Sequence, residues 1–173
     1  LGPCINASGR LDTAARSLEL LCETNEERAA ELAGDLLALN QSRKAMTEKG
    51  KEEAIRLIEE TGLNEDRVLV VYLPDCHESL AGIIAGRIRE KYHKPVFVLT
   101  KGENSVKGSG RSIEAYSMYE EMVKCGDLLI QFGGHPMAAG LSIEEKNVEL
   151  FRKQLNANCT LTEEELRPKI VID

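Results

Sequence analysis

Three glycine-rich segments of this 173-residue sequence bring small residues together with cationic or imidazole side chains. The first segment, residues 107–112, reads KGSGRS. Glycines such as Gly110 let a ligand approach the backbone closely, and the planar fork of Arg111 suits the oxygens of a phosphate. A bulged strand that carries a solvated arginine is the structural alternative, and the spacing alone leaves both open.

The second segment, residues 132–140, reads FGGHPMAAG. Gly133 and Gly134 can expose consecutive backbone N–H groups, which form a nest for anionic oxygens. His135 can add a hydrogen-bond donor that strengthens when the ring is protonated. A tight turn with a structurally hydrogen-bonded histidine is the alternative interpretation.

The third segment, residues 76–87, reads CHESLAGIIAGR. His77 falls where a strand is expected to end and a helix to begin, which is the place where open α/β sheets collect ligands. A histidine that caps the helix is the alternative. The remaining histidine, His93, stands beside Lys94 and Pro95 in a predicted turn and is interpreted as a surface residue.

Several other chemistries are not predicted. The three histidines are far apart and have no aspartate cluster beside them, so the sequence predicts no two-metal site. It contains neither a Ser–His–Asp signature nor a P-loop. The five cysteines are scattered without a CxxC pair, which favours free thiols in a reducing cytoplasm over disulfides or a zinc site.

The net charge of −7 argues against the broad basic face that most nucleic-acid-binding domains present. The acidity is uneven, however. Residues 14–66 carry 7 Lys and Arg against 13 Asp and Glu, whereas residues 67–140 carry 9 against 8. Any contact with a polyanion must therefore be local, through a few placed cations.

A predicted helical region precedes the three glycine-rich segments. Residues 13–61 contain no proline, two glycines and apolar residues at three-and-four spacing, which predicts one long helix. Gly34 and Gly50 are its candidate breaks, and Gly62 is expected to end it. Residues 1–12 form a polar, glycine-rich lead-in.

Beyond the helix, short apolar strands alternate with helices, which predicts a sheet covered on both sides. The expected strands are residues 67–73, 95–100, 106–112, 128–132 and 141–143, and the expected helices are residues 78–92, 116–124 and 147–156. Residues 169–172 read as a further strand that is just beginning. The predicted fold class is therefore α/β: a long N-terminal connector helix followed by a small α/β domain with a mixed sheet covered by helices.

Taken together, these segments resemble the RecJ family of exonucleases. Residues 2–11, GPCINASGRL, are similar to the stretch that closes the family's catalytic DHH domain, and the predicted long helix resembles the connector that follows it. The glycine-rich segments resemble motifs of the family's DHH-associated C-terminal domain. The matching residues are His77, Gly82, Ile83, Ala85 and Arg87, then Lys107 to Ser112, then Phe132 to Gly140.

Three positions depart from the family's pattern. Cys76 stands where the family has tryptophan, Ser79 takes the place of a small residue, and Cys4 replaces a frequently basic one. The first two departures leave the detailed role of His77 open.

The resemblance implies an organisation into four parts. Residues 1–12 would end the catalytic domain, residues 13–62 would be the connector helix, and residues 63–160 would form the DHH-associated substrate-binding domain. Residues 161–173 would begin the following domain or a linker. Both ends of the chain would then be boundaries inside a longer protein.

The implied activity is 5′-to-3′ digestion of single-stranded DNA in repair and recombination, in the cytoplasm. Two metal ions, Mn²⁺ or Mg²⁺, would activate water against the phosphodiester. Their ligands would lie in the catalytic DHH domain upstream, so this chain would hold no metal and would be inactive alone. Its partners would be single-stranded DNA and that DHH domain.

The resemblance also assigns residues that would hold the strand's phosphates. Arg111 would bind a phosphate through its fork, Ser112 would add a hydroxyl donor, and Gly133, Gly134 and His135 would supply the backbone nest and the imidazole. Gly110, His77 and Arg87 would complete the phosphate-binding set, and Asn6 and Arg10 would hold strand or domain contacts near the interdomain cleft.

Other functions remain open at this point. A nanoRNase or phosphoesterase of the same DHH group would act on short oligonucleotides, but such proteins usually have a much shorter connector. A non-catalytic module such as the C-terminal region of alanyl-tRNA synthetase would only bind nucleic acid, and the GSGRS and INASGRL segments speak against it. A regulatory domain for a small ligand is the third alternative, although no residue pattern identifies such a ligand.

Overall fold

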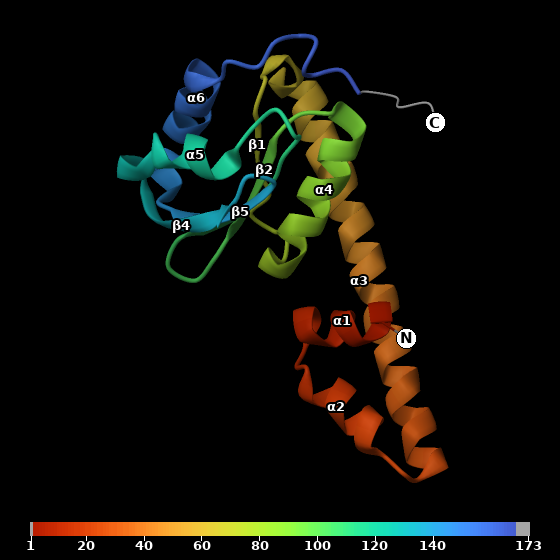
Figure 1. The fold of residues 1–173 in the computed structure, drawn as a ribbon. Helices are drawn as coiled ribbons and strands as arrows, with labels where there is room; N and C mark the ends of the chain where they lie inside the picture. The colour runs from red at the N-terminus through yellow and green to blue at the C-terminus, as the bar shows by residue number, and fades with distance from the viewer. Residues whose placement is uncertain (1, 169–173) are drawn as a thin grey trace. The chain divides into compact units, whose positions relative to one another are not determined.

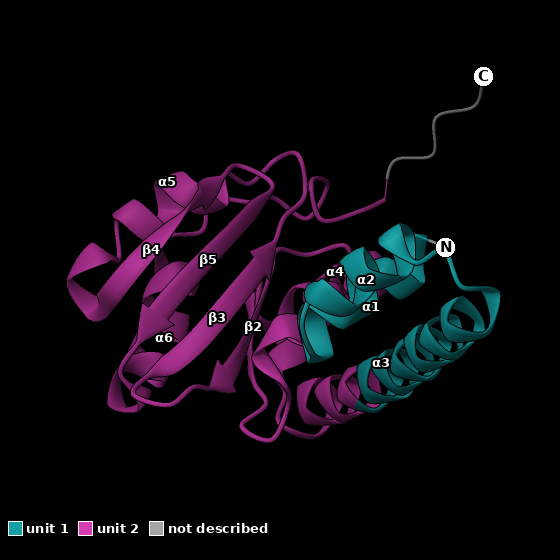
Figure 2. Ribbon diagram, turned by 90° about the horizontal axis from the view of Figure 1, so that it is seen from below, with its two compact units in different colours: residues 1–49 teal, residues 50–173 magenta. Residues whose placement is uncertain are grey.

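The computed structural model describes residues 2–168, and the predicted strand at residues 169–172 lies outside them. The chain divides into two compact units, residues 1–49 and residues 50–173 (Figure 2). Along residues 2–168, no helix combines the length and the apolar character that crossing a membrane requires.

The first unit is helical. It contains α1 (Gly2–Leu11), α2 (Ala15–Cys22) and the first part of α3 (Glu26–Glu60). The hydroxyls of Ser8 and Ser17 lie 2.7 Å apart in its interior, where Ser8 Oγ also donates to the carbonyl of Ile5. The polar lead-in predicted at residues 1–12 is therefore largely the helix α1.

The helix predicted over residues 13–61 is interrupted, but the predicted positions of the break were wrong. The chain leaves the helix after Cys22 because the Glu23 carboxylate accepts hydrogen bonds from the N–H groups of Thr24 and Asn25, both at 2.9 Å. Asn25 Oδ1 then accepts the N–H of Arg28 at 3.0 Å and begins α3 as a side-chain cap.

Neither predicted glycine breaks α3. Gly34 is exposed, and a Cβ there would meet nothing within 4 Å. At Gly50 a Cβ would lie 2.6 Å from Ile84 Cδ1, so the missing side chain lets α3 approach α4 closely. Gly62 follows the helix with a φ of 73°, as expected for a glycine that ends a helix.

The second unit is built on one mixed sheet (Figure 1). Its strands are β1 (Leu69–Tyr72), β2 (Val96–Lys101), β3 (Val106–Arg111), β4 (Leu129–His135) and β5 (Ala138–Ile143), in the order β1-β2-β3-β5-β4. The pair β1–β2 is parallel and the other pairs are antiparallel. The helices are α4 (Ala81–Tyr92), α5 (Met118–Val123) and α6 (Val148–Asn158), with 3-10 turns η1 (Leu63–Glu65), η2 (Glu78–Leu80), η3 (Gly126–Leu128) and η4 (Glu145–Asn147).

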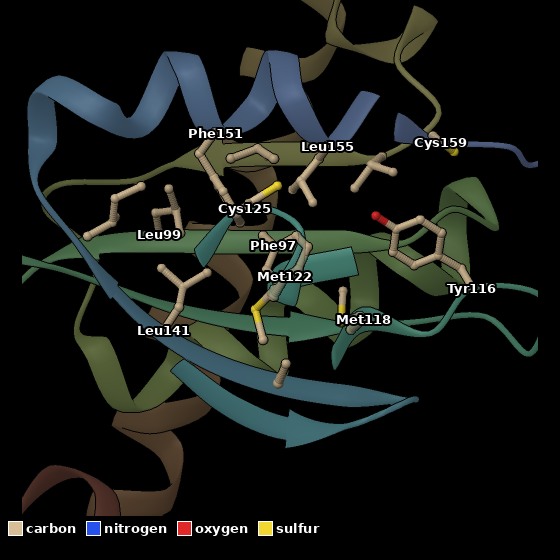
Figure 3. Packing of buried hydrophobic residues seen from close by; sticks show 14 of the residues in the cluster. Phe97, Leu99, Tyr116, Met118, Met122, Cys125, Leu141, Phe151, Leu155 and Cys159 are labelled. Carbon is tan, nitrogen blue, oxygen red and sulfur yellow. The ribbon is translucent and has the colours of Figure 1, made fainter. Parts of the chain in front are cut away.

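Helices α5 and α6 cover one face of the sheet, and Figure 3 shows the core between them and the strands. In this core Phe97 of β2 meets Phe151 of α6 edge to face, with ring centroids 5.5 Å apart. On the other face, α4 and the end of α3 pack on alternate residues of β1 and β2, such as Val71 and Val98. The predicted α/β fold with a mixed sheet between helices is confirmed.

Candidate anion-binding surface

Strand β3 separates polar from small and apolar side chains. Val106 belongs to the core under α5 and α6. A Cβ added at Gly108 or Gly110 would point into the same core. A Cβ at Gly108 would lie 2.4 Å from Leu99 Cδ2, and one at Gly110 would lie 2.6 Å from Met118 Sδ. Since side chains alternate along a strand, Lys107, Ser109 and Arg111 project from the opposite face.

The register of β3, β5 and β4 extends this polar face into three rows. Each row takes one residue from each strand: Arg111, Ala138 and His135 in the first, Ser109, Gly140 and Gly133 in the second, and Lys107, Ser142 and Gln131 in the third. Successive rows are about 6.8 Å apart, which is two residues along a strand. Polar side chains of β3 and β4 thus flank a central strip of small residues on β5.

A pocket of about 620 Å³ occupies the second and third rows. The turn η2 and the first residue of α4 form its wall, through Glu78, Ser79 and Ala81. Its floor comes from β3, β5 and β4, and Thr100 of β2 lines it as well. Lys107 Nζ donates to Ser142 Oγ at 3.0 Å, on this floor.

Arg111 lies at the first row, beside the start of α4. Its Nη1 donates to the carbonyl of Gly110 at 2.7 Å. Gly82 of α4 is so close that a Cβ there would come within 2.8 Å of Arg111 Nη2. The backbone of β3 and the helix therefore orient the guanidinium, which is only partly buried.

His135 is exposed at the end of β4, in the same row as Arg111. The turn that follows is tied to the segment after β3, because Ser112 N–H donates to the Met137 carbonyl and Met118 N–H to the Pro136 carbonyl. The structure thus brings the Arg and His motifs together across the small residue Ala138.

Gly133 and Gly134 do not form the predicted nest of backbone N–H groups. Both lie inside β4 and pair with Gly140 and Ala139 of β5. Consecutive N–H groups of a strand point to opposite sides, so these two cannot converge on one anion. Gly134 has a φ of 153° and a Cβ there would lie 2.5 Å from the Ala138 carbonyl, which explains the glycine sterically.

Two further predicted residues face away from this surface. Ser112 is fully buried, and its hydroxyl donates to the Tyr116 carbonyl at 2.6 Å. A Cβ at Gly110 would point into the core, toward Met118 and Phe97. The Ser112 hydroxyl is therefore not presented to a ligand, and Gly110 serves close packing instead of ligand approach.

His77 takes the capping position that the sequence left as an alternative. It precedes η2, its Nδ1 accepts the Ser79 N–H at 3.3 Å, and the same nitrogen lies 2.7 Å from Ser79 Oγ. His77 thereby shapes the turn that forms the pocket wall.

The remaining predicted residues are dispersed. Arg87 is exposed on α4 and pairs with Glu90 at 2.9 Å, without lining the pocket. Asn6 and Arg10 are exposed on α1, in the first unit. Among residues 2–168, no group of three His, Cys, Asp or Glu side chains could hold a metal ion.

Sequence reasoning missed Ser109, Gln131 and Ser142 as members of this surface and gave Lys107 no role. A signal was available in β3, because Lys107, Ser109 and Arg111 recur at every second residue. No comparable signal marks Gln131 or Ser142, which join the surface only through the pairing of β4 and β5.

Comparisons with known proteins place the second unit in a known domain family. Residues 65–160 match the model of the DHHA1 domain family. The chain is 36% identical to the single-stranded-DNA-specific exonuclease RecJ of Bacillus subtilis over 177 residues, and 39% identical to that of Escherichia coli over 168 residues. These matches cover 100% and 92% of this chain but 22% and 29% of those proteins.

Solved structures give the same result. A crystal structure of RecJ from Thermus thermophilus in complex with Mn²⁺ matches with a TM-score of 0.81 and 32% identity, over 90% of this chain and 23% of that one. The corresponding structure with Mg²⁺ has a TM-score of 0.80. The chain thus spans less than a third of each of these relatives.

Proposed function

Because the chain belongs to the DHHA1 domain family and is homologous to the RecJ exonucleases, we propose that it is the substrate-binding part of a 5′-to-3′ single-stranded-DNA exonuclease. The polar face of β3, β5 and β4 holds the phosphates of the strand. Mn²⁺ or Mg²⁺, bound by a catalytic DHH domain outside this chain, activates the water that cleaves the phosphodiester. The enzyme acts in DNA repair and recombination in the cytoplasm.

The observation that carries this proposal is the row formed by Arg111, Ala138 and His135. A guanidinium binds two phosphate oxygens through parallel N–H bonds, and an imidazole N–H two strands away can donate to the same or the next phosphate. Ala138 between them is small enough to let a sugar-phosphate backbone lie close to the sheet. The donors belong to strands, which hold them more rigidly than loops do.

This role agrees with the charge of the chain. The overall charge is −7, so binding does not depend on a broad basic surface. Three cationic or imidazole side chains, Lys107, Arg111 and His135, are instead placed on one face. In the cleavage step their contribution is to position the strand against the metal ions of the catalytic domain.

The test introduces substitutions into the full-length enzyme that contains this chain and measures its nuclease activity. Arg111→Ala removes a charge-assisted fork contact worth about 1.5–3 kcal/mol, so kcat/KM on 5′-phosphorylated single-stranded DNA should fall roughly 10- to 150-fold. Arg111→Lys should recover part of the loss, because the ammonium keeps the charge without the fork. His135→Ala should also lower kcat/KM, and the double variant should be less than additive if both side chains bind one phosphate.

Arg56→Ala is the matched control. This arginine is exposed on α3 and pairs with Glu53 and Glu60, so its loss removes the same charge from another surface. The proposal fails if His135→Ala lowers the melting temperature while the activity of each folded molecule stays near wild type. That result would assign the histidine a purely structural role. Alone, the chain should not degrade DNA with Mn²⁺. Nuclease activity that follows the pure protein through gel filtration would contradict the proposal that the catalytic metal ions are bound by a domain outside this chain.

A further inference from the structure

The pocket end farthest from Arg111 contains a buried hydroxyl that the fold does not use. Thr100 of β2 is fully buried, lines the pocket and pairs across the strands with Lys107. Among residues 2–168, no group hydrogen-bonds to its Oγ1. Buried hydroxyls normally have a partner because leaving one unpaired is costly, so this one calls for an explanation.

The residues that follow Thr100 across the sheet in the same row are polar. Lys107 Nζ donates to Ser142 Oγ at 3.0 Å, Ser142 is only 7% exposed, and Gln131 completes the row on β4. The ammonium of Lys107 has three donors, and one contact to a neutral hydroxyl leaves it able to bind an anion. An anion that attracts the ammonium away from Ser142 would open the way to the hydroxyls of Ser142 and Thr100.

We propose that Thr100, Lys107, Ser142 and Gln131 form a second phosphate subsite, which binds a phosphate further along the same strand. This inference rests on the proposed function, and it adds a minimum length to the substrate. The Lys107 row and the Arg111 row are four residues of β3 apart, or about 14 Å. With the Ser109 row between them, the three rows take three successive phosphates of an extended strand.

Glu78 restricts what enters this subsite. It lines the same pocket from the η2 wall, so its carboxylate repels a free anion. A phosphate that belongs to a strand already held at Arg111 is bound in spite of this repulsion, because the second contact is intramolecular. The subsite therefore selects strands of three or more nucleotides over single nucleotides.

The experiment titrates the 173-residue chain with 5′-phosphorylated thymidylates of one to four nucleotides, with affinities taken from NMR shift changes. Lys107→Met should leave binding of the mono- and dinucleotide unchanged and weaken the tri- and tetranucleotide about three- to tenfold. For the tetranucleotide, the slope of log K against log salt concentration should be smaller in magnitude by about 0.7 in Lys107→Met, which is the value for one phosphate contact to a single strand. Thr100→Val should also weaken only the longer strands, while its melting temperature stays equal or rises. Glu78→Gln should strengthen binding of the longer strands.

Lys101→Met is the matched control. Lys101 follows Thr100 in β2 and pairs with Val106, so it lies on the opposite face of the sheet and carries the same charge. Equal effects of Lys101→Met and Lys107→Met would mean that only bulk charge matters, and would overturn the subsite. So would a Lys107→Met effect that is absent or the same at every length, or an unchanged trinucleotide affinity in Thr100→Val.

The two proposals fail in different ways. If Arg111→Ala weakens binding at every length while Lys107→Met has no length-dependent effect, the second subsite is wrong and the proposed function stands. If Arg111→Ala leaves all four ligands bound as in wild type, the proposed function itself is wrong.

Discussion

Gly82 faces the guanidinium of Arg111 at the point where α4 begins. A Cβ on Gly82 would lie 2.8 Å from Arg111 Nη2 and 2.9 Å from Ser109 Oγ. The bare backbone of the helix therefore leaves the space that the guanidinium and the hydroxyl occupy. The close approach of Gly82 to Arg111 joins the 76–87 segment to the 107–112 segment, although the two motifs are separate in the sequence.

Gly82→Ala should displace Arg111 without unfolding the domain. The added methyl group conflicts with the ends of two side chains that can move, so the melting temperature should change little. Affinity for a 5′-phosphorylated oligonucleotide should fall severalfold, because a phosphate contact worth about 1.5–3 kcal/mol is partly lost. NMR titration and thermal unfolding on the same preparation measure both quantities.

Gly86→Ala, one turn later in α4, is the control. Its Cβ would meet nothing within 4 Å, and alanine favours a helix over glycine by up to about 1 kcal/mol. It should stabilise the domain slightly and leave binding unchanged. If Gly86→Ala weakens binding as much as Gly82→Ala, contact with Arg111 is not the cause.

Gly110→Ala should destabilise the second unit. The new Cβ would lie 2.6 Å from Met118 Sδ and 2.9 Å from Phe97 Cδ1, inside the core. Overpacking of this kind costs about 1–3 kcal/mol of unfolding free energy, which urea denaturation would measure. Gly133→Ala is the counterpart, since its Cβ meets nothing within 4 Å and should not destabilise. Equal losses of stability in the two variants would contradict this division between core-facing and exposed glycines.

Binding of single-stranded DNA by the chain alone should be weak and sensitive to salt. Few cations share the polar face, and each phosphate neutralised contributes about −0.7 to the slope of log K against log salt. A slope of magnitude roughly 1–3 is expected for a twelve-nucleotide strand. Nanomolar affinity that does not change between low and high salt would be inconsistent with binding through so few contacts.

Buried groups make the second unit sensitive to alkali. Burial raises the pKa of the Cys125 thiol from its ordinary value of 9.0 to about 11, with the nearby Glu121 carboxylate as a second cause. Burial also raises the pKa of the Tyr116 phenol and of the Cys159 thiol. Each group keeps its proton in the folded state at a pH where the unfolded chain releases it, so stability is full below the unfolded pKa and decreases above it.

The unfolding free energy should therefore fall between pH 9 and pH 11. A shift of this size in one thiol corresponds to a loss on the order of 2 kcal/mol, and Tyr116 adds to the loss above pH 10. Cys125→Ala should start from a lower stability at pH 7, because it leaves a small cavity, but should lose less on going to pH 11. Cys22→Ala, at an exposed thiol of α2, should keep the wild-type slope. Urea midpoints across this pH range are the measurement, and a flat profile for the wild type would refute the argument.

Local pattern predicted most elements of the second unit to within a few residues. The apolar run at residues 95–100 became β2 over Val96–Lys101, and Gly62 ended α3 with its positive φ. The breaks predicted at Gly34 and Gly50 were wrong because side-chain hydrogen bonds of Glu23 and Asn25, and not a glycine, divide the helical region. Asn25 before Glu26 and Glu27 is a start signal that the sequence contains, and it is where α3 begins.

The sequence by itself determined the alternation in β3, the glycine positions and the kinds of side chain available for phosphate, because these depend on local periodicity and residue type. Only the tertiary structure decided that β5 lies between β3 and β4, which places Arg111 and His135 in one row, buries Ser112 and leaves Thr100 beside Lys107. Strand order and register are set by burial and pairing between distant segments. A one-residue shift in register would turn the side chains of a strand to the other face, and no local sequence pattern specifies the order or the register of the strands.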